Sequence, residues 1–279
     1  MKKDSRITVS RREFAKASAA AISTFAVLRG ASAQGSSEVL KVGLLGCGGR
    51  GTGALTQMLQ GNENVKVIAL ADVFPDKVDR TRKQIESNDA FAKKRDIKDD
   101  HCFTGLDAYQ GILKTDIDIL LEGTLPYSRP GHLEAAVEAK KHIFTEKPVA
   151  VDPAGIHQVI RAAKRADELG LSFVAGTQRR HQNPYQETIA KIHEGAIGDI
   201  VSMRAYWCGG LPFAHDRKPE WTSDLEYCIR NWYAHCWVCG DNIVEQHVHN
   251  LDVCNWVKNA HPTAVFASGG RTWKPKEEK

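Results

Sequence analysis

The chain lacks the features that mark several special classes of protein. Its 7 cysteines are spread out without the spacing of a small disulfide framework, and it contains neither an internal repeat nor a low-complexity linker. Collagen-like, disordered and disulfide-stapled proteins are therefore excluded, and we expect the cysteines to be thiols. With 279 residues, 42% of them hydrophobic and 26% charged, the chain is long enough for one large or two modest globular domains.

Outside its first 33 residues, the chain also lacks an excess of positive or negative charge. The formal net charge of +4 arises in residues 1–33, which hold seven lysines and arginines against two acidic residues. The rest of the chain has 31 basic and 32 acidic residues, a net charge of −1. Nucleic-acid-binding surfaces need clustered positive charge. We therefore expect no nucleic-acid partner.

The apolar run Ala17–Leu28 is too short to cross a membrane. It has 12 residues, and a helix of that length falls well short of a hydrocarbon core about 30 Å thick. The run follows Arg11 and Arg12 and precedes the small residues Ala31–Ala33, which is the layout of a twin-arginine export signal. We expect residues 1–33 to be cleaved, the export machinery to be a partner, and the mature protein to be periplasmic or otherwise extracytoplasmic, without a stable membrane span. A disordered basic N-terminus and an uncleaved anchor are the alternatives.

Strands and helices alternate over residues 38–170. Short apolar runs predict four strands, at Val39–Leu45, Val65–Ala71, Ile117–Glu122 and Ile143–Thr145. Helices are predicted at Gly51–Gly61, at Pro75–Lys94 and from a cap at Asp152 to Gly170, the last with an apolar stripe of Ile156, Ile160, Ala163 and Ala166. Such alternation predicts an α/β fold with a doubly wound, mostly parallel sheet.

The pattern changes in residues 171–279. A helix is predicted at about Pro184–Glu194 and strands at Ile200–Trp207 and Ala264–Ser268, separated by an irregular stretch rich in Trp, Gly and Pro. We therefore expect a second domain of α+β type.

A glycine-rich loop joins the first predicted strand to its helix. Residues 46–51 read Gly-Cys-Gly-Gly-Arg-Gly, which satisfies the G-x-G-x-x-G pattern of dinucleotide-binding loops, and Gly49 adds a fourth glycine. The helix N-terminus would face the pyrophosphate. Asp72 ends the second strand, where a carboxylate can accept hydrogen bonds from the adenosine ribose and would repel a 2′-phosphate. Asp72 thus favours NAD over NADP, although Arg50 leaves NADP as a possible cofactor. The alternative for the whole motif is a glycine-rich turn that binds no ligand.

Three further motifs follow the glycine loop along the chain. They are Thr124-Leu125-Pro126, with His132 opening the next helix; Glu146-Lys147-Pro148; and a later His-x-x-Asp helix with His249 and Asp252. With the glycine loop, they make residues 40 to about 270 resemble the Gfo/Idh/MocA family of NAD(P)-dependent oxidoreductases. The resemblance implies a Rossmann domain, and it assigns cofactor contacts to Thr124, Pro126, His132, Glu146 and Lys147. The family's lysine lies beside the nicotinamide and the reacting carbon, so Lys147 would stabilise the substrate oxygen. An ordinary solvated Glu-Lys pair is the alternative.

The later helix carries the second group of candidates. Glu245, His249 and Asp252 fall at i, i+4 and i+7, so a continuous helix would place them on one face, beside a buried stripe of Val244, Val248 and Leu251. The family pattern is Asp-x-Gly-x-His-x-x-Asp, and here Glu245 replaces its first Asp and His247 its Gly. We expect His249 to be the general base, Glu245 to orient the ring and Lys147 to hold the substrate oxygen. Alternatively, Lys147 takes the proton itself.

The substrate is expected to be a sugar, polyol or glycoside with a secondary hydroxyl. Arg180 and Tyr185 follow a strand that resembles the family's domain junction; with Asp252 they are candidates for contacts to a polyhydroxylated substrate, a structural role being the alternative. Family members usually continue with more strands of an open, mostly antiparallel sheet that carries oligomer contacts. The resemblance therefore implies that this chain is C-terminally truncated and that the full-length protein is a homo-oligomer.

Three competing interpretations remain open. Cys236 and Cys239 have the spacing of metal ligands, but no second pair accompanies them, so we expect no metal site. A NAD-assisted glycosidase that oxidises and re-reduces its substrate, or a non-catalytic nucleotide-binding protein, would share the glycine loop. Product analysis separates these functions.

Overall fold

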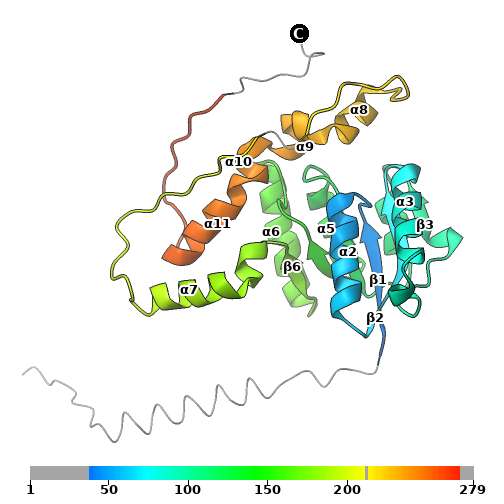
Figure 1. Cartoon of the computed structure of the whole chain (residues 1–279), viewed down its shortest axis with the longest axis horizontal. Coiled ribbons are helices and arrows are strands. Elements are labelled where there is room, and N and C mark those ends of the chain that lie inside the picture. Colours follow the sequence, from blue (N-terminus) through cyan, green and yellow to red (C-terminus); the bar gives the residue numbers. More distant parts are fainter. Residues whose placement is uncertain (1–37, 211–212, 271–279) are drawn as a thin grey trace, which may run out of the picture. The chain divides into compact units, whose positions relative to one another are not determined.

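A computed structural model describes residues 38–210 and 213–270 of the chain (Figure 1). The predicted export signal, residues 1–33, lies outside the described residues. The described residues from Leu40 onward belong to one compact unit. Within the described residues no helix is both long and apolar enough to span a bilayer.

Six parallel strands form the sheet at the centre of the fold. In chain order they are β1 (Leu40–Leu45), β2 (Val65–Asp72), β3 (Cys102–Thr104), β4 (Ile119–Glu122), β5 (His142–Thr145) and β6 (Phe173–Ala175). Their order across the sheet is β3-β2-β1-β4-β5-β6, and every pair is parallel. The strand order reverses direction between β1 and β4, and such folds bind ligands outside the carboxyl ends of the strands at that point. The predicted doubly wound sheet is confirmed.

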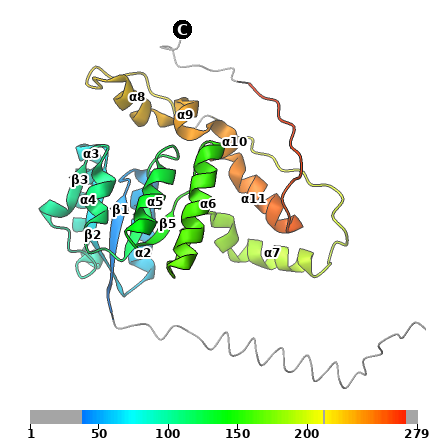
Figure 2. The same cartoon turned by 180° about the vertical axis from the view of Figure 1, so that it is seen from behind.

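Helices cover both faces of this sheet (Figures 1 and 2). On one face, α2 (Gly49–Gly61) and α3 (Pro75–Glu86) pack their leucines, valines and isoleucines on β1 and β2. On the other lie α4 (Ala108–Leu113), α5 (Arg129–Glu138) and α6 (Pro153–Glu168). Because both faces are buried, the strands are continuous apolar runs, and this is why they could be predicted from the sequence.

The end of one predicted helix and the extent of the sheet differ from the prediction. The helix expected to reach Lys94 ends at Glu86, after which the Asn88 side chain accepts a hydrogen bond from the backbone of Ala90, 3.1 Å away. Asn side chains stabilise turns in this way, in competition with the helix. The sheet also continues past the expected domain boundary at residue 170, because β6 pairs with β5.

Helix α6 begins as predicted but faces the core with a different stripe. Asp152 caps it by accepting a hydrogen bond from the backbone of Gly155 at 2.7 Å. Val159, Ala162 and Ala166 are buried, whereas Ile156 and Ile160 are 40% and 46% exposed. The predicted stripe was therefore wrong at its two isoleucines: small residues at 162 and 166 let the helix lie close to α5 and the sheet.

After Ala175 the described residues contain helices and irregular segments but no strand. The elements are η3 (Gln178–His181), α7 (Asn183–His193), α8 (Asp224–Arg230), η4 (Trp232–Ala234), α9 (Cys236–Cys239), α10 (Asp241–Glu245) and α11 (His247–Lys258). The segments expected to be strands, 200–207 and 264–268, form none. A strand requires a neighbour that takes up its backbone hydrogen bonds, and the described residues supply none to these segments.

Candidate functional site

The glycine loop has the geometry of a dinucleotide cradle. Gly46 has φ +97°, and a Cβ there would lie 2.5 Å from the carbonyl carbon of Gly123, so only glycine fits. A Cβ on Gly51 would lie 2.0 Å from the Gly46 oxygen. By contrast, nothing lies within 4 Å of a Cβ built on Gly48 or Gly49, and α2 opens at Gly49. The loop therefore leaves open space beside a helix N-terminus, which suits a pyrophosphate.

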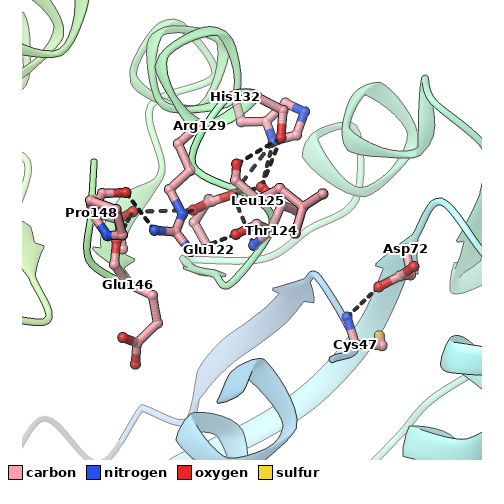
Figure 3. A network of polar contacts seen from close by, with 11 residues as sticks. Cys47, Asp72, Glu122, Thr124, Leu125, Arg129, His132, Glu146 and Pro148 are labelled. Atoms are coloured by element: carbon pink, nitrogen blue, oxygen red, sulfur yellow. Dashed lines mark hydrogen bonds and ion pairs between the residues drawn. The ribbon is translucent and has the colours of Figure 1, made fainter. Parts of the chain in front are cut away.

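Asp72 connects this loop to the next one. Its carboxylate accepts a hydrogen bond from the backbone of Cys47 at 2.8 Å (Figure 3) and another from the backbone of Phe74 at 2.9 Å. Burial raises the pKa of Asp72, and the two backbone hydrogen bonds oppose that rise. Each carboxylate oxygen keeps a second lone pair, so the site remains suited to ribose hydroxyls.

A cavity of about 570 Å³ extends from this loop. Six of the predicted cofactor residues line it: Gly46, Gly48, Gly49, Asp72, Thr124 and His132. The other five, Arg50, Gly51, Pro126, Glu146 and Lys147, do not. The Arg50 guanidinium instead pairs with the buried Glu146, Nε to Oε1 3.2 Å, and so joins the start of α2 to the loop after β5.

A buried charged network lies beneath Thr124 (Figure 3). Glu122 ends β4, and its side chain is fully buried. Its carboxylate accepts hydrogen bonds from the hydroxyls of Thr124 and Thr145, and it pairs with the Arg129 guanidinium, Nε to Oε2 2.9 Å. Burial raises the pKa of Glu122, but Arg129, His132 and Thr124 outweigh burial and hold it below its usual value. The carboxylate is thus kept charged in the interior.

Arg129 also holds two loops at once. Its guanidinium donates hydrogen bonds to the carbonyl of Pro148, 2.5 Å away, and to the carbonyl of Thr124. These carbonyls belong to the loops after β5 and β4, which carry the two predicted motifs. Neither Glu122 nor Arg129 was predicted as a site residue. The available signal was a glutamate ending an otherwise apolar strand, Ile-Leu-Leu-Glu.

Glu245 contacts Lys147, whereas the helix pattern predicted that it would lie one turn before His249 on a continuous helix and orient its ring. The chain breaks between α10 and α11 at Gln246, so Glu245 and His249 do not share one continuous helix. The Lys147 ammonium donates to the Glu245 carboxylate at 2.9 Å and to its backbone carbonyl at 2.5 Å. Burial raises the pKa of Glu245, and the nearby Lys147 lowers it in part. Glu245 therefore holds the lysine.

His249 lies in the same interior but has other neighbours. Its ring stacks on Trp207, with centroids 6.1 Å apart. Burial, helped by the charges of Lys147 and Arg179, lowers the pKa of His249 to about 4. The imidazole is therefore neutral at pH 7, with a lone pair free for a proton but a reduced basicity. The expected buried stripe was wrong: Leu251 is 50% exposed, and the buried positions are Glu245, His249 and Asn250.

The three substrate candidates separate into a pair and a single residue. Arg180 and Asp252 bind each other, Nε to Oδ2 2.9 Å, and so fix η3 to α11. Tyr185 lies under the Arg179 guanidinium, 5.7 Å from its ring centroid, and lines a second cavity of about 300 Å³. A group of three metal-ligating side chains is absent from the part of the chain that the structure describes.

Comparisons with known proteins agree with this geometry. Residues 40–173 match the model of the Gfo/Idh/MocA oxidoreductase family, described as having a NAD-binding Rossmann fold. Inositol 2-dehydrogenase of Acidothermus cellulolyticus is 25% identical over 233 residues, 83% of this chain and 57% of that protein. The 2,7-anhydro-N-acetylneuraminate hydratase of Escherichia coli is 27% identical over 154 residues, 55% of this chain and 37% of that protein.

Solved structures share the fold. The scyllo-inositol dehydrogenase of Lactobacillus casei with bound NAD(H) and scyllo-inositol has a TM-score of 0.57 at 20% identity, covering 79% of this chain and 56% of that one. For myo-inositol 2-dehydrogenase of Lactobacillus plantarum the TM-score is 0.60 at 18% identity, with 79% and 56% covered. The chain spans about half the length of the curated relatives it matches.

Proposed function

The chain belongs, through residues 40–173, to the Gfo/Idh/MocA family of NAD-binding oxidoreductases, and from this premise we propose that it oxidises or reduces a polyol- or sugar-like substrate. The reaction transfers a hydride between nicotinamide and a carbon that bears a secondary hydroxyl. The observation that carries the proposal is the position of Lys147, which follows the carboxyl end of β5 and is held there by Glu245. Inositol dehydrogenases among the relatives support the substrate class.

The residues of the glycine loop fit NAD. The open space at Gly48 and Gly49 would let a pyrophosphate approach the backbone, and Asp72, at the end of β2, would accept hydrogen bonds from the adenosine ribose. When bound, NAD supplies the acceptor of the hydride. Arg50 is engaged by Glu146, so its guanidinium does not serve a 2′-phosphate in this conformation. We expect NAD to bind more tightly than NADP, which a titration of both would check; tighter NADP binding would contradict the role of Asp72.

The chemical steps at the substrate are assigned to Lys147, His249 and Glu245. The Lys147 ammonium holds the substrate oxygen and stabilises the charge that develops on it. His249, neutral at pH 7, takes the hydroxyl proton as the alcohol is oxidised to a ketone. Its lowered pKa makes His249 a weak base. The competing assignment gives the proton to Lys147, and the two assignments predict different effects of replacing His249. Glu245 orients Lys147 through two contacts.

Single-turnover hydride transfer, measured against pH in the full-length protein, tests these roles. Loss of a general base costs about 10²- to 10⁴-fold in the chemical step. We expect His249→Asn to show that loss while NADH still binds, and Lys147→Met to lose rate as well. If His249→Asn keeps both its rate and its pH profile, the proton goes to Lys147 instead.

A second function is favoured by one relative. The Escherichia coli protein is named as a hydratase, so the match does not by itself require net oxidation. A glycosidase that uses a resident NAD would release sugar without net NADH. A dehydrogenase would form NADH with inositols or sugars, and a binding protein would do neither.

Export and assembly belong to the same proposal. The arginines at 11 and 12 support twin-arginine export to an extracytoplasmic compartment. Replacing both with lysine should retain the precursor in the cytoplasm, and unchanged export would contradict the assignment. A homo-oligomer of the full-length protein is the expected assembly, and its mass in solution by light scattering would test it.

A further inference from the structure

One wall of the large cavity comes from a segment far along the chain. Residues 213–238, here termed the clamp segment, include α8, η4 and most of α9. Figures 1 and 2 both place α8 and α9 beyond the carboxyl ends of the strands. Eight residues of the clamp segment line the cavity, among them Phe213, Arg230, Trp232 and Trp237, and the glycine loop and Asp72 line it as well. A ligand that fills the cavity is therefore enclosed between the sheet and this segment.

Arg230 anchors the clamp segment at the end of β2. Its guanidinium pairs with Asp76 near the start of α3, Nη2 to Oδ1 2.9 Å, and lies 3.7 Å from the centroid of the Phe74 ring. Glu226, one turn earlier in α8, accepts from the Arg230 Nε at 2.9 Å and orients it. Phe74 is two residues from Asp72, which marks the adenosine end of a Rossmann site.

A second anchor lies at the loop after β4. The backbone N–H of Tyr127 donates to the carbonyl of Val238 at 3.3 Å, and the rings of Tyr127 and Trp237 meet edge to face, with centroids 5.2 Å apart. The clamp segment is thus fixed to the Rossmann sheet's loops at two places, with the cavity between them. Of these two anchors, the one at Arg230 depends on side-chain charge.

We propose that the clamp segment retains the dinucleotide, with the Arg230 contact to Asp76 and Phe74 as the anchor that must release before the adenosine half can leave. The proposal rests on NAD binding, the premise of the proposed function. Arg230 is then a positioning residue that sets the cofactor's dissociation rate. Arg230 makes both an ion pair and a cation–π contact, so we expect the loss of its side chain to raise the dissociation rate about tenfold.

Displacement of NADH by excess NAD in a stopped-flow instrument measures this rate. Trp232 and Trp237 line the cavity, so energy transfer from tryptophan to NADH provides the signal. Arg230→Ala should raise the dissociation rate about tenfold. Asp76→Asn should raise it as well, since Asp76 does not line the cavity and its carboxylate pairs with Arg230. Raising the salt concentration should speed release from the wild type more than from either variant.

Arg82→Ala is the matched control. Arg82 also bridges a carboxylate on its own helix, Glu86, and one elsewhere, Asp99, but it lies away from the cavity. Its loss should leave the rate unchanged. Limited proteolysis of the NAD-free protein gives an independent measurement: cleavage within residues 213–238 should become faster in Arg230→Ala and Asp76→Asn than in the control.

The outcomes are decisive. If only Arg230→Ala speeds release, Arg230 acts by direct contact with the cofactor and the anchor is refuted. If neither variant changes release or proteolysis, the clamp segment does not control exit. If the wild type binds no NADH at all, the proposed function itself fails, which is a result distinguishable from the first two.

Discussion

The residues up to Ala175 and those after it differ in how their apolar side chains are covered. In the first part, the strands lie between two helical layers, and Val42, Leu44 and Leu120 are fully buried. In the second, Val201 and Phe266 are 95% and 94% exposed. Yet Glu245 and His249, the site residues from the second part, are buried. The second part buries apolar side chains of its own, among them Trp221, Tyr227 and Val238. Its segments around Val201 and Phe266 are uncovered, whereas Glu245 is buried where it contacts Lys147 of the first part.

The largest expected effect comes from breaking the buried charge pair of the first part. Arg129→Met would leave the Glu122 carboxylate buried without its partner, which typically costs about 3–5 kcal/mol of unfolding free energy. Chemical denaturation at pH 7 measures this loss. Adding Glu122→Gln to the same chain should restore much of it, because the uncompensated charge is removed.

The pH dependence of the same pair has a definite sign. Since the pKa of Glu122 is lowered in the folded protein, the pair stabilises the wild type above the carboxylate's usual range and loses its effect as pH falls through the lowered value. In Arg129→Met the strongest of the contacts that oppose burial is lost, while those of His132 and Thr124 remain, so the pKa of Glu122 should rise. That variant should recover stability on mild acidification where the wild type does not, and parallel pH profiles would contradict this.

Gly51→Ala should come next, at about 2–3 kcal/mol. The added Cβ would lie 2.0 Å from the Gly46 carbonyl oxygen, so the loop must move and NADH binding should be lost with it. Gly53→Ala is the matched control in the same helix, where the nearest atom to an added Cβ is the flexible Arg50 side chain at 3.4 Å. That change should stabilise by about 0.5–1 kcal/mol. Equal effects of the two would show that the loop is not tightly packed.

Removing Lys147 tests the contact between the two parts. Lys147→Met should cost about 1–3 kcal/mol at pH 7, because Glu245 is left buried and unpaired. The pKa of Glu245 is already raised by burial and should rise further. The folded state then holds a proton that the unfolded state releases, so the stability of the variant should fall as pH rises from 4 to 8. Lys191→Met, at an exposed pair with Glu194, should show no such slope in thermal unfolding.

The smallest effect is expected at the exposed apolar residues of the second part. Phe266→Ser should change the unfolding free energy by less than about 0.5 kcal/mol, as ordinary surface substitutions do. Phe91→Ser, at a buried ring, should cost several times more. A loss above about 2 kcal/mol for Phe266→Ser in the full-length protein would show that further chain or another copy covers this residue in solution, and would remove the contrast between the two parts.

The sequence predicted those parts whose signal is local. The glycine loop, the cap at Asp152 and the Glu146-Lys147 motif each depend on residues within a few positions, and the buried strands are short apolar runs. Asp76 and Arg230 are 154 positions apart, and no local pattern connects them. The break at Gln246 was missed because neither glycine nor proline marks it. The strand expected at residues 200–207 has suitable residues, but a strand also needs a partner, which its own sequence does not specify.

The break at Gln246 has one more consequence, for communication within the molecule. It frees the Glu245 carbonyl, so that the ammonium at the end of β5 binds both polar groups of a residue from the far part of the chain. Under the proposed function, a substrate oxygen that binds Lys147 would compete with Glu245 for the ammonium, and a shift of α10 would redirect that ammonium. Because such coupling is reciprocal, binding of substrate to Lys147 would then affect the position of α10 as much as the position of α10 affects binding.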